Sequence, residues 1–142
     1  MRRILVAIDG SDTALRALDF AVQQARHAPA AALHVLNVQP TLSNYTAAEI
    51  YVTAERIHQV AVERARAILD SAAERLKTVD CSFELEQLEG EPAETIANRA
   101  GELGCESIVM GTHGLTSFGI LFMGSVAQRV VHHANVPVTL VK

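Results

Sequence analysis

The sequence SIVMGTHGLTSFGILFMGSV, residues 107–126, joins a short apolar run to a glycine-rich loop and then to a segment with helical spacing. Gly111 and Gly114 are separated by two residues, and Gly124-Ser125 follows after nine more. Because glycine has no Cβ, backbone N–H groups in such a loop can turn towards a ligand and approach it closely. The predicted helix from Val126 to Ala134 opens with N–H groups that lack intrahelical partners, and such an end binds anions. The spacing therefore indicates a phosphate-binding loop.

Apolar runs of strand length alternate with longer segments along the rest of the chain. Residues 4–8, 33–38 and 107–110 show little polar alternation, which is typical of strands covered on both faces. Residues 82–88 alternate between apolar and polar, as expected for an exposed edge strand. Residues 138–141 predict a last strand, with Pro137 at its entry.

Four segments between these strands have helical spacing. They cover residues 12–27, with Ser11 or Asp12 as the N-cap, the long stretch 49–77, residues 92–103 before Gly104, and residues 126–134. Strands that alternate with helices predict an α/β fold with a doubly wound parallel sheet.

Ligands of such sheets bind beyond the carboxyl ends of the strands, where the strand order reverses. If the first strand is central, the reversal lies between it and residues 107–110. The loops leaving those two strands are 9–11 and 111–114. The glycine motif is therefore expected at the ligand-binding edge.

Composition limits the possible partners. The chain has 142 residues, 12 basic against 16 acidic, and a net charge of -4, which predicts one domain over residues 1–142 and no nucleic-acid partner. Cys81 and Cys105 form no CxxC pair, so we expect two buried thiols in a cytoplasmic protein. Asp9 ends the first apolar run too early for a signal peptide, and no run is long enough for a membrane span.

The chain resembles the universal stress protein family along its whole length, from Arg3-Ile4-Leu5-Val6-Ala7-Ile8-Asp9-Gly10-Ser11 to Val136-Pro137-Val138-Thr139-Leu140-Val141. Its glycine motif matches the one that marks the ATP-binding branch of that family. The resemblance implies a five-stranded sheet in the order 3-2-1-4-5 with helices on both faces, and a homodimer joined through the last strand, between Val136 and Val141. It also implies bound ATP, with Mg²⁺.

The same resemblance implies a role for individual residues. Asp9 would meet the ribose or a phosphate-bound metal, and Val38 would meet the adenine edge. Ala7, Met110 and Gly111 would line the nucleoside. The remaining implied site residues are those of the phosphate side: Thr112, His113, Gly114, Gly124, Ser125 and Val126.

One difference from the family concerns charge. Members often carry Arg or Lys between the two glycine pairs, whereas residues 115–123 of this chain contain neither. A triphosphate would then depend on backbone dipoles, Mg²⁺ and His113, and AMP or ADP are alternative ligands.

Plainer interpretations stand beside these. The glycines can serve only as turns, Asp9 can cap the first helix and Ser125 the last, and His113 can be a solvated loop residue. His132 and His133 would complement the dipole of the last helix rather than bind metal. Phe118, Ile120, Leu121 and Phe122 can anchor the loop in the core or face another subunit.

Three functions are compatible with the sequence. The first is a homodimeric stress protein that uses ATP occupancy as a switch. The second is slow ATP hydrolysis or autophosphorylation, with Thr116, Ser117 or Ser125 as the acceptor. The third is a protein interaction module without nucleotide. The chain lacks the GxGxxG, GxxxxGK[ST], GxSxG and HExxH signatures, so binding without efficient turnover is favoured.

Overall fold

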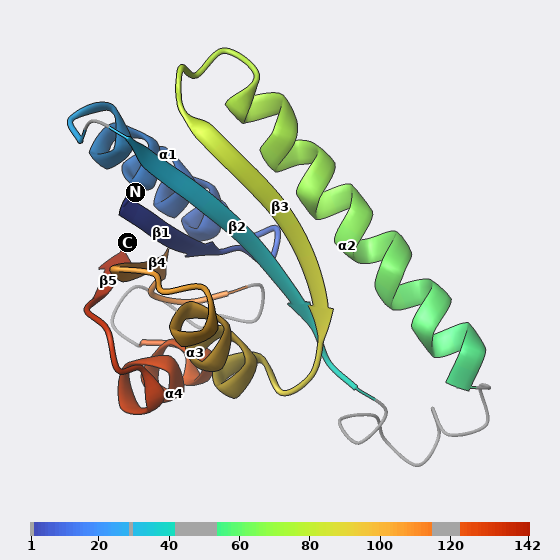
Figure 1. The fold of residues 1–142 in the computed structure, drawn as a ribbon. Coiled ribbons are helices and arrows are strands. Elements are labelled where there is room, and N and C mark those ends of the chain that lie inside the picture. Colours follow the sequence, from blue (N-terminus) through green and yellow to red (C-terminus); the bar gives the residue numbers. More distant parts are fainter. Residues whose placement is uncertain (1, 29, 42–53, 115–122) are drawn as a thin grey trace.

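A five-stranded parallel sheet forms the centre of the computed structural model, which describes residues 2–28, 30–41, 54–114 and 123–142 (Figure 1). The elements are, in chain order, β1 (Arg2–Ala7), α1 (Asp12–Arg26), β2 (Ala31–Gln39), α2 (Ala54–Leu76), β3 (Ser82–Glu89), α3 (Pro92–Glu102), β4 (Ser107–Gly111), α4 (Ser125–His133) and β5 (Val138–Val141). The strand order is β3-β2-β1-β4-β5. The expected α/β fold and its order 3-2-1-4-5 are confirmed.

The central strand β1 pairs in parallel with β2 on one side and with β4 on the other. The chain first adds strands on one side of β1 and then crosses to its other side. The carboxyl ends of β1 and β4 are therefore the place where the order reverses, and the crevice beyond them is the ordinary ligand position in such sheets.

Each face of the sheet has its own hydrophobic core because successive side chains of a strand point to opposite faces. Ile4 and Val6 of β1 pack with α1 and α2 in the first core. Leu5 and Ala7 pack with α3 and α4 in the second. Figure 1 shows α1 behind β1 and β2, α2 alongside β3, and α3 and α4 nearer the viewer. The apolar runs of the sequence are thus buried from both sides.

Every helix follows a parallel strand, so every helix begins at the carboxyl edge of the sheet (Figure 1). Ser11 is the N-cap of α1, and its hydroxyl accepts a hydrogen bond from Ala14 N at 3.2 Å. Glu91 is the N-cap of α3, with Pro92 as the first helical residue. The positive ends of the helix dipoles consequently gather at one edge.

Most element boundaries differ from the predicted ones by one or two residues, and the burial of one cysteine also differs from expectation. The described part of the long helix starts at Ala54, and residues 49–53 lie outside the described residues. β1 ends at Ala7, although Ile8 N still donates to Leu36 O at 2.9 Å. Cys105 is buried as expected, but the expectation was wrong for Cys81, which is only partly buried. Cys81 precedes β3, and β3 is an edge strand with a neighbour on one side only.

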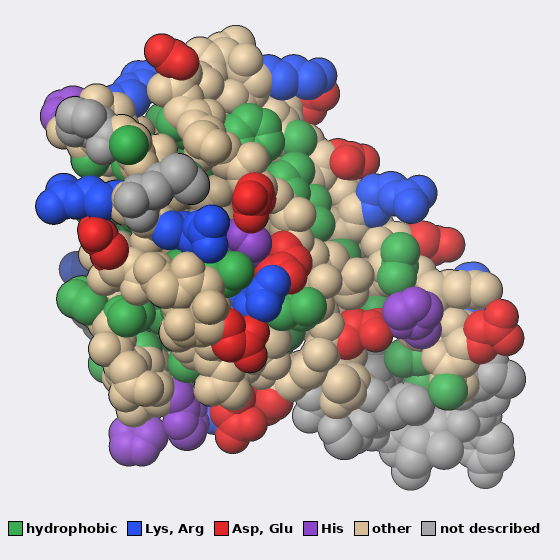
Figure 2. Space-filling model, in the orientation of Figure 1, with side chains coloured by type: hydrophobic (Ala, Val, Ile, Leu, Met, Phe, Trp, Pro, Cys, Tyr) green, Lys and Arg blue, Asp and Glu red, His purple; other side chains and the backbone are tan. Residues whose placement is uncertain are grey.

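An ion-pair cluster attaches α3 to β3 and β2. Arg99 of α3 donates two hydrogen bonds to the Glu86 carboxylate of β3, at 2.8 and 2.9 Å. The buried His34 of β2 lies 2.6 Å from the same carboxylate through Nε2. Figure 2 shows acidic, basic and histidine side chains gathered in the middle of this face. Burial alone would raise the pKa of Glu86, but the hydrogen bonds from Arg99 and His34 outweigh it and hold this pKa below its usual value.

In the part of the chain that the structure describes, no helix is long and apolar enough to cross a membrane.

Candidate functional site

A cavity of about 740 Å³ opens at the carboxyl edge of the sheet, between β1 and β4. It lies where the strand order reverses, as the sequence predicts. The structure brings ten of the predicted site residues to its wall: Ala7, Asp9, Val38, Met110, Gly111, His113, Gly114, Gly124, Ser125 and Val126.

Thr112 is the predicted site residue that is absent from the described lining of the cavity. Its backbone is used within the protein, because Thr112 N donates to Val141 O at 2.9 Å and Thr112 O accepts from Gly124 N at 2.6 Å. Its hydroxyl lies 2.9 Å from His113 Nδ1. Thr112 therefore ties the glycine loop to the end of β5 and to the start of α4.

Asp9 follows β1 and turns back into the site. Its Oδ1 accepts a hydrogen bond from Ser11 N at 2.9 Å. Gly10 has a φ of +87°, which lies in the left-handed region that glycine adopts without strain. The alternative interpretation of Asp9 as the helix cap was wrong, because Ser11 occupies the N-cap position of α1.

The far oxygen of Asp9 lies directly against Gly114. A Cβ built on Gly114 would overlap Asp9 Oδ2. Gly114 is thus a glycine because a carboxylate fills the space that a side chain would need. This contact joins the loop after β1 to the loop after β4.

Gly111 allows a second close approach, between the end of β4 and the first turn of α1. A Cβ on Gly111 would lie 2.9 Å from Thr13 Cβ and 3.1 Å from the Thr13 backbone carbon. The Thr13 hydroxyl also donates a hydrogen bond to His113 O. Because Thr13 is in the first turn of α1, the glycine loop rests on the start of that helix.

The start of α4 forms the third part of the wall. Gly124 is the N-cap and makes no side-chain cap bond, and Ser125 is the first helical residue. The alternative interpretation of Ser125 as the N-cap was therefore wrong. Gln128 N donates to Gly124 O at 3.0 Å, so the N–H groups of Ser125 to Ala127 precede the first bond of the helix. These three residues line the cavity.

The opposite wall of the cavity is apolar. Leu36 and Val38 of β2, Ile96 of α3 and Met110 of β4 line it. A site with an apolar floor and one polar rim suits a ligand that has a flat apolar part and an anionic part.

Among the described lining residues the only charged side chain is Asp9. The two longer segments outside the described residues, 42–53 and 115–122, contain no Lys or Arg in the sequence. Anion binding at this site would therefore depend on backbone N–H groups and on the dipole of α4.

Sequence reasoning missed several lining residues, including Ile8, Leu36, Pro92 and Ile96. For Leu36 a signal existed, because it shares a strand face with Val38. It also missed Asn37, a buried amide whose Nδ2 donates to Ile8 O at 2.8 Å. This bond holds Ile8, the residue between the end of β1 and Asp9, against β2.

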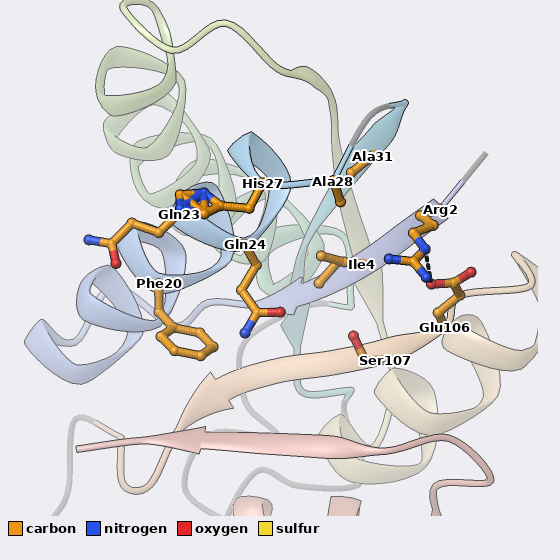
Figure 3. Close-up of a pocket in the computed structure, with 10 residues that line it drawn as sticks. All are labelled: Arg2, Ile4, Phe20, Gln23, Gln24, His27, Ala28, Ala31, Glu106 and Ser107. Carbon is orange, nitrogen blue, oxygen red and sulfur yellow. Dashed lines mark ion pairs between the residues drawn. The ribbon is translucent and has the colours of Figure 1, made fainter.

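A second cavity, of about 560 Å³, lies over the amino-terminal half of β1 (Figure 3). Gln24 and His27, at the carboxyl end of α1, line it. Its cation, Arg2, is already paired with Glu106 at 3.4 Å. Because a helix carboxyl end repels anions, this cavity is a poor phosphate site, in contrast to the first.

His132 and His133 lie in the last turn of α4, as the dipole argument expects, with ring centroids 5.3 Å apart. Within the described ranges, no three His, Cys, Asp or Glu residues are grouped as metal ligands would be. The apolar loop residues Phe118, Ile120, Leu121 and Phe122, and the acceptor candidates Thr116 and Ser117, lie outside the described residues.

Comparison with known proteins gives a consistent result. The model of the universal stress protein family matches residues 1–142. The chain is 32% identical to the universal stress protein YxiE of Bacillus subtilis, covering 99% of this chain and 98% of that protein. It is 35% identical to a universal stress protein of Thermus aquaticus, with the same two coverages of 99% and 98%.

Solved structures of this family have the same architecture. The universal stress protein UspA of Lactobacillus plantarum superposes with a TM-score of 0.83 at 28% identity, covering 99% of this chain and 97% of that one. A universal stress protein in complex with cAMP superposes with a TM-score of 0.72 at 27% identity, covering 99% of this chain and 97% of that one. The universal stress protein from Archaeoglobus fulgidus in complex with dAMP superposes with a TM-score of 0.74 at 26% identity, covering 100% of this chain and 98% of that one. From its sequence match and its fold, this chain belongs to the universal stress protein family.

Proposed function

We propose that this protein is a single-domain, adenine-nucleotide-binding stress protein whose nucleotide occupancy acts as a switch. The observation that carries the proposal is the cavity of about 740 Å³ at the carboxyl edge, with an apolar floor and the start of α4 on its rim. Ligand pockets generally measure about 300–1,000 Å³, so a nucleotide fits in size. The base of the nucleotide suits the apolar floor, and its phosphate suits the start of α4.

The adenine packs against the apolar floor in this proposal, with Ala7, Val38 and Met110 around the base and the nucleoside. Asp9 accepts a hydrogen bond from a ribose hydroxyl. The phosphate lies against the backbone of Gly111 to Gly114 and of Gly124 to Val126, with the Ser125 hydroxyl as a further donor. Thr112 contributes by holding this loop in place through its bonds to Val141 and Gly124.

Two family members with known ligands support the class of nucleotide. Their structures contain cAMP and dAMP, and both ligands carry one phosphate. The site of this chain has no described lining cation to balance a longer phosphate chain. ATP binding would therefore require a cation from outside this lining, and Mg²⁺ is one for which Asp9 offers an oxygen ligand of the preferred kind.

We also propose that two copies associate through the edge strand β5, between Val136 and Val141. β5 pairs with β4 on one side and is the last strand of the sheet. Its four side chains are only partly buried. A second copy of β5 would satisfy its outer backbone groups. Sedimentation velocity tests this assembly, and a monomer at every concentration would refute it without affecting the nucleotide proposal.

The first experiment is to identify what the protein carries. The protein is purified without added nucleotide and denatured, and the released molecules are identified by chromatography and mass spectrometry. An adenine nucleotide in near-stoichiometric amount is expected. If the protein is empty and neither AMP nor Mg-ATP raises its melting temperature, the proposal is wrong and a protein interaction module is the better interpretation.

Turnover is tested on native protein from the same purification, with γ-labelled ATP. We expect binding without rapid phosphate release, because hydrolysis needs a positioned water and stabilisation of the charge that develops on the phosphate. Label transferred to the protein or rapid release of phosphate would support the enzymatic alternative.

A further inference from the structure

An ion pair connects the beginnings of α3 and α4 beside the cavity. Arg129 Nη1 of α4 donates to Glu91 Oε1 at 2.7 Å. Glu91 is the N-cap of α3 and immediately precedes Pro92, which lines the cavity. Arg129 is the only arginine of α4.

Helix geometry directs Arg129 towards that side. It follows Val126 by three residues and Ser125 by four, so all three lie on one face of α4. The rise of a helix puts its Cα roughly 6 Å along the axis from that of Ser125. Helical side chains tilt towards the N-terminus, so the long Arg129 side chain extends back along the face that carries Ser125 and Val126, both of which line the cavity.

The present partner of Arg129 holds it only weakly. The Arg129 side chain is 51% exposed and that of Glu91 is 28% exposed, and exposed ion pairs contribute little to stability. A phosphate group carries more charge than a carboxylate and accepts the same forked hydrogen bonds from a guanidinium. Exchange of Glu91 for a phosphate is therefore favourable once a phosphate comes within reach.

We infer that Arg129 supplies the cation for the β- and γ-phosphates of a bound nucleotide, and that Glu91 competes for it and so sets the preference between AMP and ATP. This inference rests on the proposed function. The first phosphate lies on the backbone N–H groups of α4, which both nucleotides use equally. The outer phosphates meet Arg129 only after it leaves Glu91. The competition with Glu91 therefore lowers the affinity for ATP and leaves the affinity for AMP unchanged.

Two substitutions at this pair should have opposite effects. Arg129→Met keeps the apolar stem and removes the charge. It should lower the affinity for Mg-ATP by roughly tenfold and change the affinity for AMP by less than about twofold. Glu91→Gln frees Arg129, and it should tighten Mg-ATP relative to AMP. Glutamine keeps an oxygen that can accept the capping bond from Glu94 N, now 2.8 Å from Glu91 Oε2.

The matched control is Arg75→Met. Arg75 forms an exposed ion pair of the same length, 2.7 Å, with Asp19, but on the other face of the sheet. This variant loses the same charge and should leave the ratio of the two affinities as in the wild type.

The measurement is the ratio of the dissociation constants for Mg-ATP and AMP, by isothermal titration at fixed ionic strength, for the wild type and the three variants. Opposite shifts in the Arg129 and Glu91 variants support the inference, because damage to the fold would weaken both nucleotides together. An unchanged ratio in Arg129→Met, with wild-type AMP affinity, overturns the inference and leaves the proposed function standing. No binding of either nucleotide by the wild type overturns both.

Discussion

Replacement of Gly114 by alanine should damage the site more than the fold. The alanine Cβ would overlap Asp9 Oδ2, while the next atom of Asp9, Cγ, would be 3.6 Å away. The overlapping atom is the end of a side chain that can rotate. The alanine is accommodated if the carboxylate of Asp9 swings away and gives up its hydrogen bond from Ser11 N, now 2.9 Å long.

The magnitude follows from that one bond. A hydrogen bond to a charged group contributes about 1.5–3 kcal/mol, and water can recover part of this for a half-exposed loop. Glycine to alanine returns about 0.4–1 kcal/mol through the entropy of the unfolded chain. We therefore expect Gly114→Ala to lower the free energy of unfolding by about 1 kcal/mol. Because the displaced Asp9 carboxylate moves within the cavity, nucleotide affinity should fall by at least about tenfold.

A double-mutant cycle tests this reasoning. Asp9→Ala removes the overlapping oxygen and the hydrogen bond together, so adding Gly114→Ala should then cost nothing or stabilise slightly. Urea unfolding of the wild type, the two single variants and the double variant gives the coupling energy. An equal cost of Gly114→Ala in both backgrounds would refute the argument, because the alanine would then be in conflict with something other than Asp9.

Three further predictions concern the fold around the site. Gly111→Ala should lower the free energy of unfolding by about 1–3 kcal/mol in urea, because its Cβ would meet the fixed backbone of Thr13; wild-type stability would contradict this. The lowered pKa of Glu86 stabilises the fold above about pH 4.5, and this contribution is lost as the pH falls further. Glu86→Gln should therefore show a flatter acid unfolding curve by circular dichroism, and an equally steep one would exclude Glu86 as its source. In the native protein a maleimide should label Cys81 before Cys105, which is 4% exposed. Burial raises the pKa of both thiols, and equal labelling rates by mass spectrometry would mean that the second core opens.

Much of the fold was predictable because the pattern of each element agrees with its burial. Residues 4–8 and 107–110 are almost wholly apolar, and the corresponding strands are covered on both faces. The two loops that follow these strands bear the glycines and Asp9, so topology alone brought them to the same cavity.

Local choices between neighbouring residues were not predictable. Asp9, Ser11 and Asp12 are all suitable caps for α1, and only the backbone geometry selects Ser11. The same holds for Gly124 and Ser125 at the start of α4, where a glycine without a side-chain bond occupies the cap.

Contacts between distant segments were also beyond the sequence. Asn37 has the position of an ordinary strand residue, yet its amide bonds to Ile8, 29 positions earlier. Glu86 belongs to an alternating edge strand, where a carboxylate is expected to be solvated. Its pairing with Arg99 and His34 depends on where α3 crosses the sheet, which no periodicity encodes.

The shared direction of the helices has a practical consequence for any binding experiment. α1, α3 and α4 all begin at the carboxyl edge, so that edge favours small inorganic anions as well as the phosphate of the proposed nucleotide. Phosphate or sulfate in a buffer would occupy the start of α4 and compete by mass action. Titrations in such buffers will report a weaker nucleotide affinity than titrations in a buffer without these anions, and the difference will grow with the buffer concentration.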